Sequence, residues 1–97
     1  MQYNFEWDPV KARSNAEKHG VSFEQATEVF KDPMALTLYD DDSASSEEDR
    51  WITLGQSNGQ HYLVVAHTYR NQQDNAVTIR LISARPATRR EIKQYEG

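Results

Sequence analysis

The spacing of apolar residues changes twice along this chain of 97 residues. Residues 3–7 alternate apolar and polar side chains, which is the pattern of a half-buried strand. Between residues 22 and 31 the apolar positions lie three and four residues apart, so a helix there has one apolar face. From Met34 the period is two again, which predicts a strand over residues 34–39.

The first helix is predicted over residues 9–19. Asp8 precedes it, and an aspartate at that position can accept a hydrogen bond from a free backbone N–H group of the first turn. Pro9 suits the first helical position because its missing N–H would be unpaired there anyway. Gly20 supplies a residue that adopts positive φ readily, and this predicts where the helix ends.

The second helix is predicted to begin after Ser22. Gln25 stands three residues further on, as a capping box requires. A proline at position 33 disfavours helical geometry at Asp32, so the helix is expected to end there. The two helices follow each other closely and predict a helical hairpin.

Further strands are predicted at residues 50–56, 61–69 and 77–84. Asn58-Gly59 lies between the first two, and both residues tolerate the positive φ of a tight hairpin turn. The polar residues 71–75 predict a second turn. Strands joined in this way pair antiparallel.

A capping box formed by Thr88 and Glu91 predicts a terminal helix. The acidic stretch 40–49 predicts a solvated loop. The whole order is β-α-α-β-β-β-β-α. It predicts one α+β domain over residues 1–97, with an N-terminal helical hairpin on one face of an antiparallel sheet and a C-terminal helix.

The net charge of −4 conceals two halves of opposite sign. Residues 1–49 contain four Lys and Arg against twelve Asp and Glu, a balance of −8. Residues 50–97 contain seven against three, a balance of +4. Six of the acids fall in residues 40–49, which contain no basic residue. A basic C-terminal half beside an acidic loop is compatible with a polyanionic partner, although the mean charge is not.

The composition of the chain indicates the cellular compartment. The chain has no cysteine, which excludes a disulfide framework and a thiolate metal site and agrees with a reducing cytoplasm. The first twenty residues are mixed and charged and do not resemble a signal peptide. The longest apolar run, residues 62–66, is too short to cross a membrane. We therefore expect a cytoplasmic protein without a membrane partner.

Several short motifs occur in a fixed order between residues 5 and 96. They are Phe5-Glu6-Trp7-Asp8-Pro9, Lys18-His19-Gly20-Val21-Ser22-Phe23-Glu24, Val29-Phe30-Lys31-Asp32-Pro33, Glu48-Asp49-Arg50, Ile82-Ser83-Ala84-Arg85, Ala87-Thr88 and Glu91. Each motif alone is weak, but their order and spacing together resemble the BrnT family of toxins.

This resemblance implies a RelE/ParE-like fold and RNA cleavage without a metal ion or other cofactor. It also implies neutralisation by a small DNA-binding antitoxin of the BrnA type, with a toxin dimer or a hetero-oligomer with the antitoxin as the assembly. Members of the family often carry a His-Ser pair shortly before the Glu-x-Arg motif. The matching positions here are Ala44-Ser45, so a histidine is missing at that place.

Metal-free RNA cleavage requires a base for the 2′-hydroxyl, positive charge at the phosphorus and an acid for the leaving oxygen. Arginine suits the second task because its planar fork can hold two phosphate oxygens. Arg85, where the last strand gives way to a turn, is the first candidate, and pairing with the acidic half is its alternative role. Arg80, in the middle of that strand, either lines a concave face or meets solvent. Arg50 either takes part or only neutralises the acidic loop.

Histidines are candidates for acid and base. His67 shares a strand face with apolar residues, so it is either a packed core residue or a catalytic group near Arg80 on the neighbouring strand. Lys18 and His19 end the first helix, where positive groups interact favourably with the last carbonyls, and the resemblance adds a binding or catalytic role. His61 begins a strand and is expected at an edge. The three histidines are not spaced like a metal site.

The terminal helix carries three further cations, which are expected to attract RNA or an acidic antitoxin segment: Arg89, Arg90 and Lys93. Glu91 is explained by the capping box, and Tyr95, one turn away, by core packing. RelE-like ribonucleases sometimes use a C-terminal tyrosine, which keeps a second role open for Tyr95. Phe5, Trp7 and Trp51 are expected in the core.

Three functions follow from this pattern. The first is an endoribonuclease toxin that inhibits translation. The second is a non-enzymatic inhibitor, because ParE toxins share the fold and poison DNA gyrase. The third is a weakly active subunit that holds the antitoxin in a repressor complex.

Overall fold

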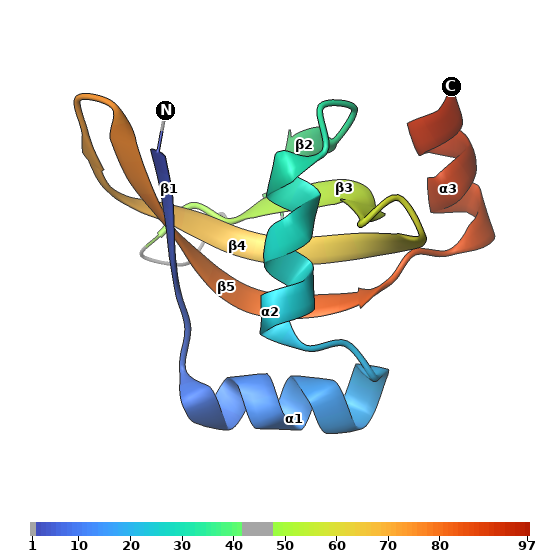
Figure 1. The fold of residues 1–97 in the computed structure, drawn as a ribbon, viewed down its shortest axis with the longest axis horizontal. Helices are drawn as coiled ribbons and strands as arrows, with labels where there is room; N and C mark the ends of the chain where they lie inside the picture. The colour runs from blue at the N-terminus through green and yellow to red at the C-terminus, as the bar shows by residue number, and fades with distance from the viewer. Residues whose placement is uncertain (1, 42–47) are drawn as a thin grey trace.

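The computed structural model describes residues 2–41 and 48–97. Its elements follow the expected order (Figure 1). They are β1 (Gln2–Glu6), α1 (Pro9–His19), α2 (Phe23–Ala26), the 3₁₀ helix η1 (Thr27–Lys31), β2 (Leu36–Tyr39), β3 (Trp51–Ser57), β4 (His61–Gln73), β5 (Ala76–Pro86) and α3 (Arg89–Glu96). The α+β class is confirmed.

The five strands form one sheet in the order β1-β5-β4-β3-β2. The pairs from β2 to β5 are antiparallel, as the short turns require. β1 instead runs parallel to β5, so the sheet is mixed rather than purely antiparallel. The reason is tertiary: β1 leaves directly into α1, and the strand with which it pairs in the described sheet lies more than 70 residues away in sequence.

The predicted helix ends are present in the structure. The Asp8 side chain accepts a hydrogen bond from the backbone N–H of Val10, and Gly20 ends α1 with a φ of 72°. Ser22 accepts a hydrogen bond from the N–H of Gln25, the first half of the expected capping box. Thr88 and Glu91 form both halves of theirs.

The second helix differs from its prediction, because it is α-helical only to Ala26 and continues as η1. In Figure 1 the α2–η1 segment crosses the strands, while α1 lies below them and transverse to it, so the two helices do not form a close antiparallel hairpin. α1 and α2 both pack on β5, and η1 packs on β3. At Gly55 the strand has no side chain, and a Cβ there would stand 3.1 Å from the Cβ of Val29.

The core lies between these helices and one face of the sheet. The buried cluster joins residues from the helical segment and from β4 and β5: Val21, Phe23, Ala26, Val29, Leu63, Val65, Ile79, Leu81 and Ala84. Phe5 and Trp7 are half-buried and pack against it, and Trp51 is half-buried beside Tyr69. Since side chains alternate along a strand, the other residues of β4 and β5 lie on the opposite face, which we call the open face.

Two turns shape the ends of the sheet. Asn58 and Gly59 have φ of 52° and 67°, as the predicted tight hairpin demands. The second hairpin is longer than predicted, because β4 continues to Gln73 and the turn is confined to the next two residues. This extension places Arg70 within a strand, where the sequence pattern had suggested the border of a turn.

Candidate functional site on the open face of the sheet

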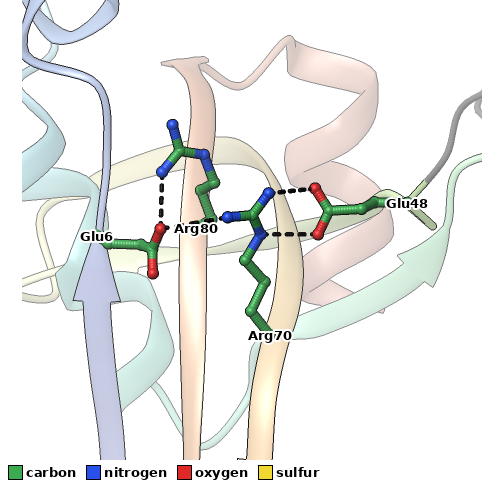
Figure 2. A network of polar contacts seen from close by, with 4 residues as sticks. All are labelled: Glu6, Glu48, Arg70 and Arg80. Atoms are coloured by element: carbon green, nitrogen blue, oxygen red, sulfur yellow. Dashed lines mark hydrogen bonds and ion pairs between the residues drawn. The ribbon is translucent and has the colours of Figure 1, made fainter.

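Strand register brings two arginines together on the open face. Arg80 of β5 pairs with Glu6 of β1 on one side and with Thr68 of β4 on the other. Arg70 lies two residues beyond Thr68 and therefore on the same face. Glu48 approaches from the segment before β3, as Figure 2 shows.

These four charged side chains form one polar network, which we call the Arg70–Arg80 network (Figure 2). Arg70 donates two hydrogen bonds to Glu48, from Nε to Oε2 at 2.7 Å and from Nη2 to Oε1 at 2.6 Å. Glu6 Oε2 lies 2.7 Å from Arg80 Nη1 and 3.6 Å from Arg70 Nη1. One carboxylate oxygen thus bridges two guanidinium groups, which is also how a phosphate oxygen between two arginines is held.

The network is charged and accessible. Its side chains keep between 31% and 42% of their surface exposed. The hydrogen bonds from Arg70 lower the pKa of Glu48, and the same contact raises the pKa of Arg70. Arg70 therefore remains cationic and Glu48 anionic at neutral pH.

Thr68 adds a neutral group beside the network. The residue is 3% exposed, and its Oγ1 has no hydrogen-bond partner among the described residues. A buried hydroxyl without a partner costs about 1–3 kcal/mol, so such groups are uncommon in a folded protein. Its place next to Arg80 in the register leaves a donor and acceptor at the edge of the network.

Arg85, the first sequence candidate, lies five residues from Arg80, about 16 Å along the strand. It forms a two-pronged ion pair with Glu91, with both N–O distances at 2.9 Å. Arg85 thereby lowers the pKa of Glu91 to about 2, helped by the backbone N–H of Thr88. The pair fastens the end of β5 to the first turn of α3.

The far end of α3 is tethered as well. The Tyr95 hydroxyl donates a hydrogen bond of 2.6 Å to Asp32 Oδ2, and this bond raises the pKa of Tyr95 to about 12. Its ring packs edge-on against that of Tyr62. Burial by itself raises the pKa of Asp32, but hydrogen bonds from Tyr95 and from two backbone N–H groups outweigh it and leave that pKa lowered. Tyr95 therefore joins α3 to the end of η1.

His67 is in the core, with no exposed surface. Its Nε2 lies 2.7 Å from Thr53 Oγ1, and the rings of Phe30 and Tyr69 stand edge-on at 4.9 and 5.1 Å. Burial lowers the pKa of His67 to about 4, so the imidazole is neutral at pH 7. RNA cannot reach a side chain covered in this way.

Of the two places considered for His67, the structure shows the packed core position, and the side chain does not face Arg80. His67 pairs with Leu81, whereas Arg80 pairs with Thr68, after a register shift between residues 66 and 67. Because neighbouring residues of a strand point to opposite faces, the histidine faces the helices and the arginine faces away from them.

The other candidates are dispersed. His19 is half-buried and lines a cleft of about 430 Å³ that His61 also lines, while Lys18 is exposed on α1. Arg50 is exposed before β3, where its carbonyl accepts a hydrogen bond from the N–H of Asp40. The three cations of the terminal helix are exposed: Arg89, Arg90 and Lys93. Ala44-Ser45 lies outside the described residues.

The comparison with protein families decides the identity. Residues 7–91 match the family model described as the ribonuclease toxin BrnT of type II toxin–antitoxin systems. The chain belongs to the BrnT family. It is thus a ribonuclease toxin of a type II system, a class whose members have an antitoxin partner.

A solved BrnT structure agrees at the level of the fold. The crystal structure of the Brucella abortus ribonuclease toxin BrnT has a TM-score of 0.59 to this chain, with 21% identity, over 92% of this chain and 100% of that one. A search of curated proteins found no match. Within the described residues, no helix is long and apolar enough to cross a membrane, and no cluster of three or more His, Asp or Glu is placed to hold a metal ion.

Sequence reasoning missed three members of the network in this BrnT chain. Glu6 and Glu48 stand within motifs that carry the family resemblance, yet neither was assigned a chemical role. Arg70 carried no signal, because the predicted strand ended one residue before it. The charge of Arg80 and its place in the sheet give a stronger signal together. A cation on a middle strand needs an anion nearby, and the acidic half of the chain contributes Glu6 and Glu48.

Proposed function

We propose that this BrnT-family chain is a metal-independent endoribonuclease whose substrate is cytoplasmic messenger RNA, bound at the Arg70–Arg80 network. The observation that carries the proposal is the single oxygen of Glu6 shared by both guanidinium groups. A scissile phosphate fits this arrangement, since two arginines can supply the positive charge that the transition state requires.

The chemistry follows from exchanging anions. A phosphate that enters between Arg70 and Arg80 displaces the Glu6 carboxylate and leaves it beside the substrate. Glu6 then takes the proton of the 2′-hydroxyl, the 2′-oxygen bonds to phosphorus, and the bond from phosphorus to the 5′-oxygen breaks. The leaving oxygen takes a proton from solvent, while the arginines hold the charge on the other phosphate oxygens.

Arg85, Arg50, Lys18 and His19 are proposed as secondary contacts to the RNA backbone, with the exposed cations of α3. His67 is left out of the mechanism because it is buried. We further propose that the antitoxin is a BrnA-like DNA-binding protein and that toxin and antitoxin form a hetero-oligomer.

The test is cleavage of an end-labelled single-stranded RNA by the purified protein in EDTA. Arg70→Gln and Arg80→Gln should each reduce the cleavage rate by about 10²–10³-fold, the usual effect of removing one donor to the transition-state charge. Glu6→Gln should also reduce it. Arg13→Gln, an exposed arginine on α1, serves as the matched control and should cleave normally.

Thermal melting of each variant separates loss of chemistry from loss of fold. Normal cleavage by folded Arg70→Gln and Arg80→Gln would show that the network is purely structural. Complete loss of wild-type activity in EDTA would contradict the metal-free mechanism. DNA damage signalling without RNA loss on expression would favour the gyrase-inhibitor alternative.

A further inference from the structure

Exposed apolar side chains concentrate on β2 and the residues before it. Four of the large hydrophobic residues that are exposed in the described chain fall between residues 34 and 39: Met34 at 65%, Leu36 at 41%, Leu38 at 69% and Tyr39 at 40%. A monomeric soluble domain of this size rarely leaves such a run uncovered. The run therefore marks a surface that is covered in use.

Register extends this run into a groove. Leu36 pairs with Leu54 and Leu38 pairs with Ile52, and Val64 follows behind Leu54 on the next strand. These five residues, which we call the β2 groove, line a hollow of about 420 Å³. Because β2 is the last of the described strands in the sheet, its outer edge also offers backbone N–H and C=O groups to another strand.

Charge indicates the kind of partner. Asp40, Asp41 and Glu91 also line the hollow, and Asp41 is exposed. Glu91 is already paired with Arg85, so Asp40 and Asp41 are the residues that make the rim of the hollow acidic. A second copy of the chain would bring the same acidic rim against it, which repulsion between like charges disfavours. A segment with apolar residues and neighbouring lysines or arginines complements both the floor and the rim.

We propose that the β2 groove is the docking site of the antitoxin, which inserts an apolar, basic segment and extends the sheet at β2. The inference rests on the toxin–antitoxin function and adds the surface through which neutralisation works. Leu54 and Val64 share the open face with Arg80, so a chain seated in the groove lies on the face that carries the Arg70–Arg80 network. The antitoxin then blocks RNA by covering that face.

The test uses the cognate antitoxin of the proposed system, purified and titrated into the chain by calorimetry. Leu38→Asp should weaken binding by about tenfold or more, as loss of an apolar anchor does. Val10→Asp is the matched control, because Val10 is 63% exposed on α1, and it should bind normally. Asp41→Lys should weaken binding and reduce its dependence on salt.

RNA cleavage is the second measurement of the experiment. Leu38→Asp should cleave RNA at the wild-type rate and resist inhibition by the antitoxin. Normal antitoxin binding by this variant would overturn the inference. The inference would also fail if the wild-type protein were a dimer that Leu38→Asp converts to a monomer. It would fail as well if Leu38→Asp lost RNA cleavage while it still bound the antitoxin.

Failure of the docking site and failure of the ribonuclease proposal remain distinguishable. If the wild-type chain cleaves no RNA but Leu38→Asp loses antitoxin binding, the docking site stands and the ribonuclease mechanism falls. If the wild-type chain cleaves RNA and Leu38→Asp binds antitoxin normally, only the docking site falls.

Discussion

The side chain of Asn15 is joined to the backbone of Ala84 by two hydrogen bonds across 69 residues of sequence. Asn15 Nδ2 donates to the Ala84 carbonyl at 2.8 Å, and Asn15 Oδ1 accepts from the Ala84 N–H at 3.0 Å. The same Nδ2 also donates to the Val21 carbonyl at 3.0 Å. Register pairing between β1 and β5 ends at Arg80. Asn15 therefore takes over the pairing of the β5 edge and fixes α1 to the sheet.

Removal of the Asn15 side-chain amide should lower the stability of the fold. Asn15→Leu removes three buried hydrogen bonds to the backbone of Val21 and Ala84, and we expect the free energy of unfolding to fall by about 2–4 kcal/mol. Urea denaturation measures the loss. Ser14→Ala, the exposed neighbour on α1, should change stability by less than about 0.5 kcal/mol. Similar values for the two variants would mean that α1 is held chiefly by its apolar contacts.

Gly55 should tolerate no side chain. A Cβ there would meet the Cβ atoms of Val29 at 3.1 Å and Ala35 at 3.2 Å. Gly55→Ala should therefore lower the free energy of unfolding by about 1–3 kcal/mol through overpacking. Combining it with Ala35→Gly removes one of the two contacting Cβ atoms, so the double variant should lose less than the sum of the single losses. Strict additivity in this cycle would place the strain elsewhere.

His67 should make stability depend on pH. Its pKa is about 4 in the fold, against 6.5 for a solvated histidine, so the unfolded chain binds more protons between these values. The stabilisation from its neutral burial is complete above pH 6.5 and is lost as pH falls toward 4. By linkage, stability should fall by about 2 kcal/mol from pH 7 to pH 5.

Urea titrations at the two pH values check this expectation. His67→Gln, which cannot titrate and keeps a polar partner for Thr53, should show a flatter pH profile. His61→Gln, at an exposed histidine, should keep the wild-type slope. An unchanged slope in His67→Gln would assign the acid sensitivity to another group.

Glu91 should make the stability of the fold depend on pH in a lower range. Its pKa of about 2 lies below the ordinary 4.5, so the Arg85 pair stabilises the fold fully above pH 4.5 and weakens as pH falls toward 2. Glu91→Gln should melt at a lower temperature at pH 7 and converge with the wild type near pH 2. Arg85→Gln should behave alike in melting. RNA cleavage then separates two roles for Arg85: loss in Arg85→Gln but not in Glu91→Gln would identify it as a phosphate contact.

The helix caps and the tight turn of the chain could be predicted from the sequence alone. Asp8, Gly20, Ser22 and Thr88 act on groups within three or four residues, and Asn58-Gly59 needs only its own backbone preferences. Such interactions depend on neighbours in sequence, so the order and type of the elements followed from them. The family resemblance had the same origin, because its motifs lie mostly at these caps and turns.

Relationships between distant segments were decided only by the tertiary structure. The parallel pairing of β1 with β5, the burial of His67 and the joining of Arg70 to Glu48 all depend on which strands become neighbours and which face each residue takes. A register shift of one residue reverses the face, and the shift in β4–β5 pairing after Ala66 together with the longer strand placed Arg70 beside Arg80. Local propensity contains no record of such a shift. The sequence by itself therefore determined the elements and the family, whereas the packing of the sheet decided which charges form the candidate site.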